Sequence, residues 1–316
     1  MTVTHTPRFL MCPPRHYAVT YSINPWMDPA EWSKDAHSLA QSTEVQWSQL
    51  KFLLEQFGAA VELMVPAAGV PDLVFTANAA VVLDGKALLA QFRHPERRLE
   101  EPHFAAAFDA LVERNVLTSR VSLPADVILE GAGDCIWDQR RRWFWVGFGP
   151  RSSEQAAIAV EETFGIPTVS MELVDPRFYH LDTAFHVLSG GEVMYFNGAL
   201  SSCSLRLLRD LVDSRDLIEV SEEDACGMRL NGIEIGRIMI LSSCSPLLRR
   251  QLEERGYQVS VTPLSAFLLS GGSAYCLTLR TDLTSVGRLP AADNRHSVDR
   301  KAVAGQLDYS AGSAAH

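Results

Sequence analysis

The last cysteine of the chain, Cys276, follows a Ser-Gly-Gly turn in the segment SGGSAYCLTL (270–279). Glycines let the backbone approach a ligand closely, and a thiol at the start of the strand predicted there can face a cleft. Such a thiol acts as a nucleophile when an acid–base partner is near and its surroundings favour the thiolate. A buried core cysteine is the ordinary alternative, and we adopt it for the other cysteines, at positions 12, 135, 203, 226 and 244.

The segment FYHLDTAF (178–185) contains a candidate acid–base residue. His180 and Asp182 are two positions apart, so on a strand both side chains would lie on the same face. A carboxylate beside a histidine stabilises the imidazolium, which suits proton transfer. From this segment alone, however, an ion pair in a surface loop is the favoured interpretation.

Two further polar clusters follow predicted strands. In LEGAGD (129–134), Glu130 and Asp134 flank a glycine-rich turn, and carboxylates held by such a turn can grip a cation. In PDLVFTANA (71–79), Asn78 lies where a predicted strand meets a turn. Ordinary turn chemistry, in which Asp and Asn bond neighbouring N–H groups, would place the same residue types there.

Composition limits the classes of protein to which the chain can belong. It has 316 residues, 47% of them hydrophobic, enough for a substantial core in two domains or one large one. Its 38 acidic and 28 basic residues give a net charge of -10, with a pI near 5.4. Such a surface repels nucleic acids and anionic membranes, but not a small cationic substrate.

The sequence also predicts where the protein works. It has no apolar run long enough to span a membrane, and MTVTHTPRFLMCPPR lacks the apolar segment of a signal peptide. We therefore expect a cytoplasmic protein with reduced cysteines. No C-x-x-C or H-E-x-x-H motif occurs, so we expect neither a metal nor another cofactor.

Alternating strands and helices predict an α/β protein. Strands are expected at 8–11, 61–65, 73–76, 80–83, 87–92, 126–129, 142–148, 184–188, 192–196, 233–241, 257–261 and 275–279. Helices are expected at 29–57, 102–114, 153–164, 203–214 and 245–255.

A quasi-repeat becomes visible when the polar residues before the apolar runs are aligned. These residues are Asn78, Asp134, Asp182, Asn231 and Cys276, and subtraction gives spacings of 56, 48, 49 and 45 residues. A period near 50 suggests five similar modules around one core. If so, the five residues occupy equivalent strand ends and can converge on one central site. We interpret residues 1–283 as a single domain, and 284–316, with few large apolar residues, as a flexible tail.

The segments FTANA, FRHPER, LEGAGD, HLDT and SGGSAYCLTL, in this order, resemble the guanidino-group-modifying enzymes of the pentein superfamily. These are the dimethylargininases, arginine deiminases, arginine dihydrolases and amidinotransferases. The segment MCPPRHYAVTYSINPWM (11–27) is most similar to the arginine dihydrolase and dimethylargininase-like branch. The resemblance covers residues 8–281 and implies a five-bladed α/β propeller of ββαβ modules with pseudo-fivefold symmetry, in agreement with the repeat.

The resemblance implies catalytic roles for Cys276, His180 and Glu130, and a cationic substrate. Cys276 would be the nucleophile and His180 the general acid–base. Glu130 and Asp182 would be the carboxylates that hold the guanidinium group. Two carboxylates would counter the charge of a guanidinium ion, and the cation would in turn favour the thiolate.

The resemblance also implies which residues bind the rest of the substrate. Arg97 and Arg151 match arginines that bind the amino-acid carboxylate, although ordinary surface arginines are the alternative for both. Asn24 matches an asparagine at the dihydrolase site. Asn231 lies in ACGMRLNGIEIG (225–236), which diverges from the usual pattern and so is expected to border the far end of the substrate.

Asn78 bears on the product. Deiminases and dimethylargininases commonly have Asp at this position, whereas arginine dihydrolases resemble this chain in having Asn. An amide can donate a hydrogen bond to the carbonyl oxygen of a neutral ureido group, and an ionised Asp cannot. We therefore expect Asn78 to favour a second hydrolysis, from citrulline to ornithine.

The predicted function is a cysteine-dependent hydrolase of the guanidino group of arginine or a close analogue. A dimethylargininase, a single-step deiminase and an amidinotransferase remain alternatives within the class. A catalytically silent arginine-binding regulatory protein is the alternative outside it. The expected partner is a small guanidino molecule, with no nucleic acid and no membrane, and a homodimer is compatible with the sequence.

Overall fold

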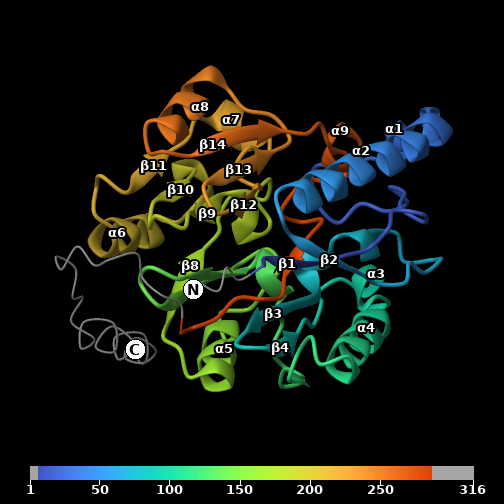
Figure 1. Cartoon of the computed structure of the whole chain (residues 1–316), viewed down its shortest axis with the longest axis horizontal. Coiled ribbons are helices and arrows are strands. Elements are labelled where there is room, and N and C mark those ends of the chain that lie inside the picture. The colour runs from blue at the N-terminus through green and yellow to red at the C-terminus, as the bar shows by residue number, and fades with distance from the viewer. Residues whose placement is uncertain (1–5, 287–316) are drawn as a thin grey trace, which may run out of the picture.

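The computed structural model describes residues 6–286, and within this range the strands form five three-stranded sheets. Every sheet has the same plan: a central strand pairs antiparallel with one neighbour and parallel with the other. The helix connecting the two parallel strands lies outside the sheet (Figure 1). This is the ββαβ module, repeated around a ring, so the predicted five-bladed propeller is confirmed.

The five sheets are β15–β1–β2 (Leu279–Arg280, Arg8–Met11, Ala60–Leu63), β3–β4–β5 (Ala80–Leu83, Lys86–Leu89, Ser119–Val121), β6–β7–β8 (Cys135–Asp138, Trp143–Phe148, Thr168–Glu172), β9–β10–β11 (Phe185–Val187, Val193–Tyr195, Leu217–Glu219) and β12–β13–β14 (Ile233–Ile235, Ile238–Leu241, Gln258–Val261). The helices are α1 (Pro29–Lys34), α2 (Ala36–Gln56), α3 (Pro95–Arg98), α4 (Glu101–Glu113), α5 (Ala156–Phe164), α6 (Ser202–Leu211), α7 (Glu222–Cys226), α8 (Pro246–Glu253) and α9 (Ser265–Leu268). Short 3₁₀ turns are η1 (Pro71–Val74), η2 (Thr76–Ala79), η3 (Gly131–Gly133), η4 (Leu181–Thr183) and η5 (Asn197–Ala199).

One module is assembled from both ends of the described chain. Strand β1 pairs antiparallel with β15, with Phe9 opposite Arg280 and Leu10 opposite Leu279. The second strand, the helices and the third strand of this module therefore come from residues 8–63, and only its first strand follows Cys276.

Local sequence accounts for the outer helices, of which α8 is an example. Ser245 caps its N-terminus by accepting a hydrogen bond from Leu248 N at 3.1 Å, and a proline begins the helix. Leu248 and Leu252 lie on its inner face and are fully buried. Gly256 beyond its C-terminus has φ +83°, a conformation that glycine adopts without strain.

Several expected strands are wrong, shortened or divided. Residues 73–76 lie in and between the 3₁₀ turns η1 and η2, and 126–129 makes only an isolated bridge, between Gln91 and Leu129. The expected strand 233–241 is two strands, β12 and β13. Of 275–279, only Leu279 is in a strand. Short apolar runs are buried in each case, and burial alone does not distinguish a strand from a buried turn. The predicted helix 29–57 is two helices, because α1 ends and α2 begins around Asp35.

The short outer strands β5, β8 and β11 were not predicted, nor was β6.

Beyond the propeller, Ser285 donates hydrogen bonds from N and Oγ to the Asp84 carboxylate, at 2.7 and 2.5 Å, so the first residues of the predicted tail are docked. The remainder of that segment, 287–316, lies outside the described residues. None of the helices between residues 6 and 286 combines the length and apolarity needed to cross a membrane.

Candidate active site

The repeated polar residues converge at the centre of the ring, as the repeat predicted. Asn78 lies in η2 and Asp182 in η4, whereas Asn231 and Cys276 lie in turns that precede β12 and β15. Asp134, the fifth, serves the backbone: its Oδ1 accepts from Leu181 N at 2.9 Å and so fixes the turn that carries Asp182.

Cys276 is buried and held by the side chain of Asn231. Asn231 Nδ2 donates to Cys276 Sγ at 3.1 Å, and Asn231 Oδ1 accepts from Cys276 N at 3.1 Å. Asp182 Oδ2 lies 3.4 Å from the same sulfur. Asn231 therefore contacts the thiol itself, a position different from the far end of a substrate that its divergent sequence context predicted.

The thiol and the carboxylate beside it are both shifted toward their neutral forms. Burial, then the nearby charge of Asp182, raises the pKa of Cys276 well above its ordinary value. Burial likewise raises the pKa of Asp182 to about 7. Asp182 Oδ1 is buried and has no hydrogen-bond partner. A planar cation placed here would satisfy this oxygen and favour both charged forms.

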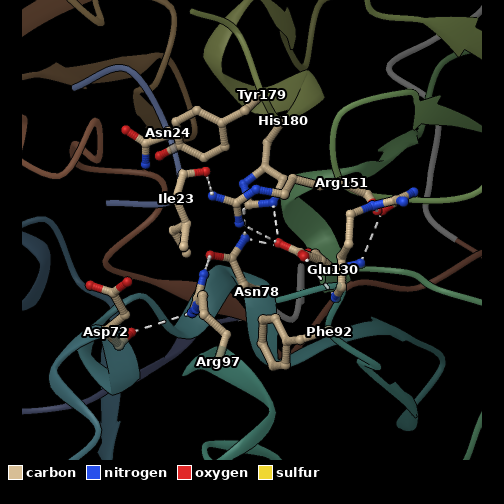
Figure 2. A network of polar contacts seen from close by, with 12 residues as sticks. Ile23, Asn24, Asp72, Asn78, Phe92, Arg97, Glu130, Arg151, Tyr179 and His180 are labelled. Atoms are coloured by element: carbon tan, nitrogen blue, oxygen red, sulfur yellow. Dashed lines mark hydrogen bonds and ion pairs between the residues drawn. The ribbon is translucent and has the colours of Figure 1, made fainter. Parts of the chain in front are cut away.

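A second group of side chains is centred on the Glu130 carboxylate (Figure 2). His180 Nε2 donates to Glu130 Oε2 at 2.7 Å, and Arg151 Nη1 donates to the same oxygen at 2.9 Å. Oε1 accepts from Arg93 N at 3.2 Å. Burial raises the Glu130 pKa, but the charge of Arg151 and the hydrogen bond from His180 outweigh it, and the net shift is downward. Glu130 is therefore ionised and orients the His180 ring.

Segment 180–182, an extended residue followed by a turn, links the two groups. His180 is extended and immediately precedes the turn η4, which contains Asp182. Both side chains are buried, within 2% exposure. The turn thus brings together a histidine bonded to Glu130 and a carboxylate beside Cys276, which is the juxtaposition that acid–base chemistry at the thiol needs.

Asn78 is packed against a glycine of the LEGAGD turn. Its Nδ2 donates to the backbone oxygen of Glu130 at 3.3 Å and lies 3.5 Å from His180 Nδ1. A Cβ at Gly133 would come within 2.3 Å of Nδ2. Only glycine therefore leaves room for the amide beside His180.

The two predicted carboxylate-binding arginines are buried at this site and are not surface residues. Arg97 donates to Glu100 and to Asn78, and its guanidinium lies 4.5 Å from the centroid of the Phe92 ring. Arg151 lies 4.7 Å from the centroid of the Tyr179 ring.

Asn24 ties the N-terminal loop to the turn before Cys276. Its Nδ2 donates to Ser270 O at 3.0 Å, and its Oδ1 accepts from Trp26 N at 2.9 Å. The Tyr179 hydroxyl also donates to Ser270 O, at 3.2 Å. Asn24 therefore borders the site, with both ends of its amide engaged.

Sequence reasoning missed Asp72 and Glu100. Asp72 is buried, burial raises its pKa, and its Oδ1 has no hydrogen-bond partner. It directly precedes residues 73–76, where a strand was expected, so only an acidic residue beside an apolar run could have indicated it. Within residues 6–286, no group of three or more His, Cys, Asp or Glu side chains is placed to hold a metal ion.

Comparison with known proteins identifies the family. The profile described as "N,N dimethylarginine dimethylhydrolase, eukaryotic" matches residues 18–282. The chain belongs to this family. The resemblance inferred from the sequence motifs is therefore confirmed.

The chain is similar to two curated members of different activity. It is 42% identical over 274 residues to the bifunctional arginine dihydrolase/ornithine cyclodeaminase ArgZ of Synechocystis sp., covering 86% of this chain and 37% of that protein. It thus spans little more than a third of ArgZ. It is 35% identical over 274 residues to the N(G),N(G)-dimethylarginine dimethylaminohydrolase of Mycobacterium tuberculosis, covering 87% of this chain and 85% of that one.

A solved structure agrees with the fold. The N-terminal domain of ArgZ, a mutant bound to substrate, matches with a TM-score of 0.82 at 39% identity, covering 89% of this chain and all of that one. The N-terminal domain of ArgZ and this chain thus have the same fold.

Proposed function

We propose that the protein is a cysteine hydrolase of the guanidino group of arginine that runs two rounds of hydrolysis, as an arginine dihydrolase. The observation that carries this proposal is the position of Asp182, with one oxygen 3.4 Å from Cys276 Sγ and the other buried without a partner. A guanidinium whose N–H groups donate to that unpartnered oxygen would have its carbon next to the thiol. The similarity to ArgZ supports the dihydrolase outcome.

The first half-reaction replaces an amino group by sulfur. The thiol gives its proton to His180, and Sγ bonds to the guanidinium carbon to form a tetrahedral adduct. His180 returns the proton to an amino nitrogen, the C–N bond breaks, and ammonia leaves. The product is a covalent thiouronium on Cys276. Glu130 stabilises the transient charge of His180 through the 2.7 Å hydrogen bond.

Water then completes the round. Neutral His180 takes a proton from a water molecule, whose oxygen bonds to the thiouronium carbon. The C–S bond breaks, and the thiolate leaves and is reprotonated, which gives citrulline. A second round on the ureido carbon would release ammonia and form a carbamate, which loses carbon dioxide to give ornithine. Asn78 Nδ2 would donate to the ureido oxygen.

The amino-acid end of the substrate would be held by charged groups around Arg97 and Arg151. We assign the carboxylate to these arginines and the α-ammonium group to Asp72, whose Oδ1 has no partner and whose pKa burial raises. Arg97 has most of its N–H groups engaged by Glu100, Asn78 and the backbone of Asp72, so Arg151 carries more of this interaction. Asn24 would shape the entrance and Asn231 would hold the thiol.

The similarity to the mycobacterial dimethylaminohydrolase makes methylated arginine the alternative substrate. A single-step deiminase, an amidinotransferase and a silent arginine-binding protein stay as outcomes of the same test. The absence of cofactors, the cytoplasmic location and a homodimer stay predictions.

The test is product analysis with arginine, monomethylarginine and dimethylarginine, each without cofactor, by mass spectrometry. We expect ornithine and two ammonia molecules per arginine. Cys276→Ala should abolish turnover, whereas Cys203→Ala, at an exposed cysteine on α6, should leave it unchanged. Citrulline with methylamines would identify a dimethylargininase, and ligand-induced stabilisation without turnover would identify a binding protein.

A further inference from the structure

The orientation of the Asn78 amide is determined by its neighbours. Asn78 Oδ1 accepts a hydrogen bond from Arg97 Nη1 at 2.9 Å, and Asn78 Nδ2 donates one to the backbone oxygen of Glu130 at 3.3 Å (Figure 2). Rotating the amide by half a turn would set Nδ2 against the Arg97 donor and Oδ1 against a carbonyl oxygen. Both contacts would then be repulsive, so Arg97 selects the orientation that turns the N–H groups toward His180.

Arg97 is itself fixed by Glu100. Nε donates to Glu100 Oε1 at 2.9 Å and Nη2 to Oε2 at 2.7 Å, a bidentate pair three residues apart. Both side chains are buried, at 4% and 0% exposure. The pair leaves the guanidinium of Arg97 no freedom to rotate away from Asn78.

The two rounds of the proposed reaction differ in what they require from Asn78. A guanidinium offers only N–H donors, so the first round makes no use of an amide donor. The ureido group offers a carbonyl oxygen, so the second round uses the amide donor. The direction in which Asn78 points is therefore a property that affects one round more than the other.

We propose that Glu100 and Arg97 are positioning residues for Asn78, and that they decide how much citrulline is retained for the second hydrolysis. This inference rests on the proposed function. Glu100 does not touch the substrate. It holds Arg97, Arg97 holds Asn78 Oδ1, and Nδ2 is thereby presented to the ureido oxygen.

The test is the ratio of released citrulline to ornithine formed from arginine by Glu100→Gln. We expect the ratio to rise about tenfold, because the ureido group loses one well-directed buried hydrogen bond. The ratio is used because it does not depend on how tightly arginine itself binds. Arg97→Lys keeps a positive charge for Glu100 but loses the Nη1 contact, and it should raise the ratio as well; it serves if the first variant fails to fold.

Asp138→Asn is the matched control. Asp138 is a fully buried carboxylate paired with an arginine three residues away, Arg141, at 2.8 Å, but it lies at the end of β6 away from Asn78. The Asp138→Asn variant should be less stable but should give an unchanged ratio of citrulline to ornithine. A folded Glu100→Gln variant with an unchanged ratio, even with reduced activity, overturns the inference and leaves the proposed function standing.

A binding measurement separates the two claims. In a Cys276→Ala background, Glu100→Gln should weaken the binding of citrulline about tenfold more than the binding of arginine. Equal weakening of both affinities overturns the inference. Wild-type protein that releases no ammonia from arginine defeats the proposed function instead.

Discussion

Arg151 Nη1 lies 2.9 Å from Glu130 Oε2, on the same oxygen that accepts the hydrogen bond from His180. Without substrate, the Glu130 carboxylate is thus neutralised by a guanidinium of the protein itself. This contact depresses the Glu130 pKa although the group is completely buried. Asp182 has no such partner, so the two carboxylates assigned to guanidinium binding are not equivalent. Glu130 is bonded to His180 and Arg151, whereas the buried Oδ1 of Asp182 has no hydrogen-bond partner.

This asymmetry predicts opposite effects of Arg151→Ala on two ligands, measured by calorimetry in a Cys276→Ala background. Arginine should bind about tenfold or more weakly, because its carboxylate loses a partner. Methylguanidine, which has no carboxylate, should bind about tenfold more tightly, because the buried Glu130 carboxylate loses the ion pair with Arg151. Parallel weakening of both ligands would contradict the idea that Arg151 competes for Glu130.

The amide of Asn78 should determine the number of hydrolytic rounds. In Asn78→Asp, an ionised carboxylate would pair with Arg97 and could no longer donate to a ureido oxygen. Product analysis should show citrulline in place of most of the ornithine. Asn115→Asp, at an exposed position, is the control and should leave the amounts of citrulline and ornithine unchanged. Unchanged ornithine output from Asn78→Asp would remove this explanation.

Arginine binding should depend on the ionisation of Asp182. Because burial raises the pKa of Asp182 to about 7, the carboxylate of the free protein gains a proton as the pH falls below that value. The protonated group cannot attract a guanidinium, so the Kd for arginine should rise by up to about tenfold per pH unit between 7 and 5. Above pH 7 the Kd for arginine should become independent of pH. Titration calorimetry on Cys276→Ala measures this, and a slope that persists in Cys276→Ala/Asp182→Asn would assign it to another group.

Close approach at Gly133 should be needed for activity more than for folding. A Cβ there would come within 2.3 Å of Asn78 Nδ2, so Gly133→Ala must displace the amide or the turn beside His180. We expect about a hundredfold loss of kcat, the usual cost of a small misplacement in an active site. Gly236→Ala, where φ is +61° and nothing lies within 4 Å, should lose about 1 kcal/mol of stability but keep its activity. Equal kcat in the two variants would be evidence against a precise role for Asn78.

The central features of the fold could be read from residue types at the strand ends. Asn78, Asp134, Asp182, Asn231 and Cys276 recur because each precedes the first strand of a ββαβ module, so their spacing suggested five similar modules around one core. The five-bladed propeller itself was implied by the family resemblance. Ring closure could not be predicted in this way, since β1 and β15 meet only in space. The backbone at the site was harder still: residues 73–76 lie in and between two 3₁₀ turns, and a short buried apolar run does not by itself distinguish a strand from a turn.

The side chains that support the site escaped sequence reasoning for the same reason. Glu100 sits three residues after Arg97 across the junction of α3 and α4, a spacing common to many exposed helical pairs. Nothing in the sequence distinguishes it from those pairs, and only burial does. Asp72 is likewise distinguished only by the structure, in which it is buried with Oδ1 unpartnered.

The most direct test of the central claim is to follow the guanidino carbon of isotopically labelled arginine by NMR, with wild-type protein and with Cys276→Ala. We expect the label to pass from arginine through the ureido group of citrulline to bicarbonate, and to stay in arginine when Cys276 is replaced. Label that remains in the guanidino group with the wild-type protein, or turnover of equal rate in Cys276→Ala, would contradict this expectation.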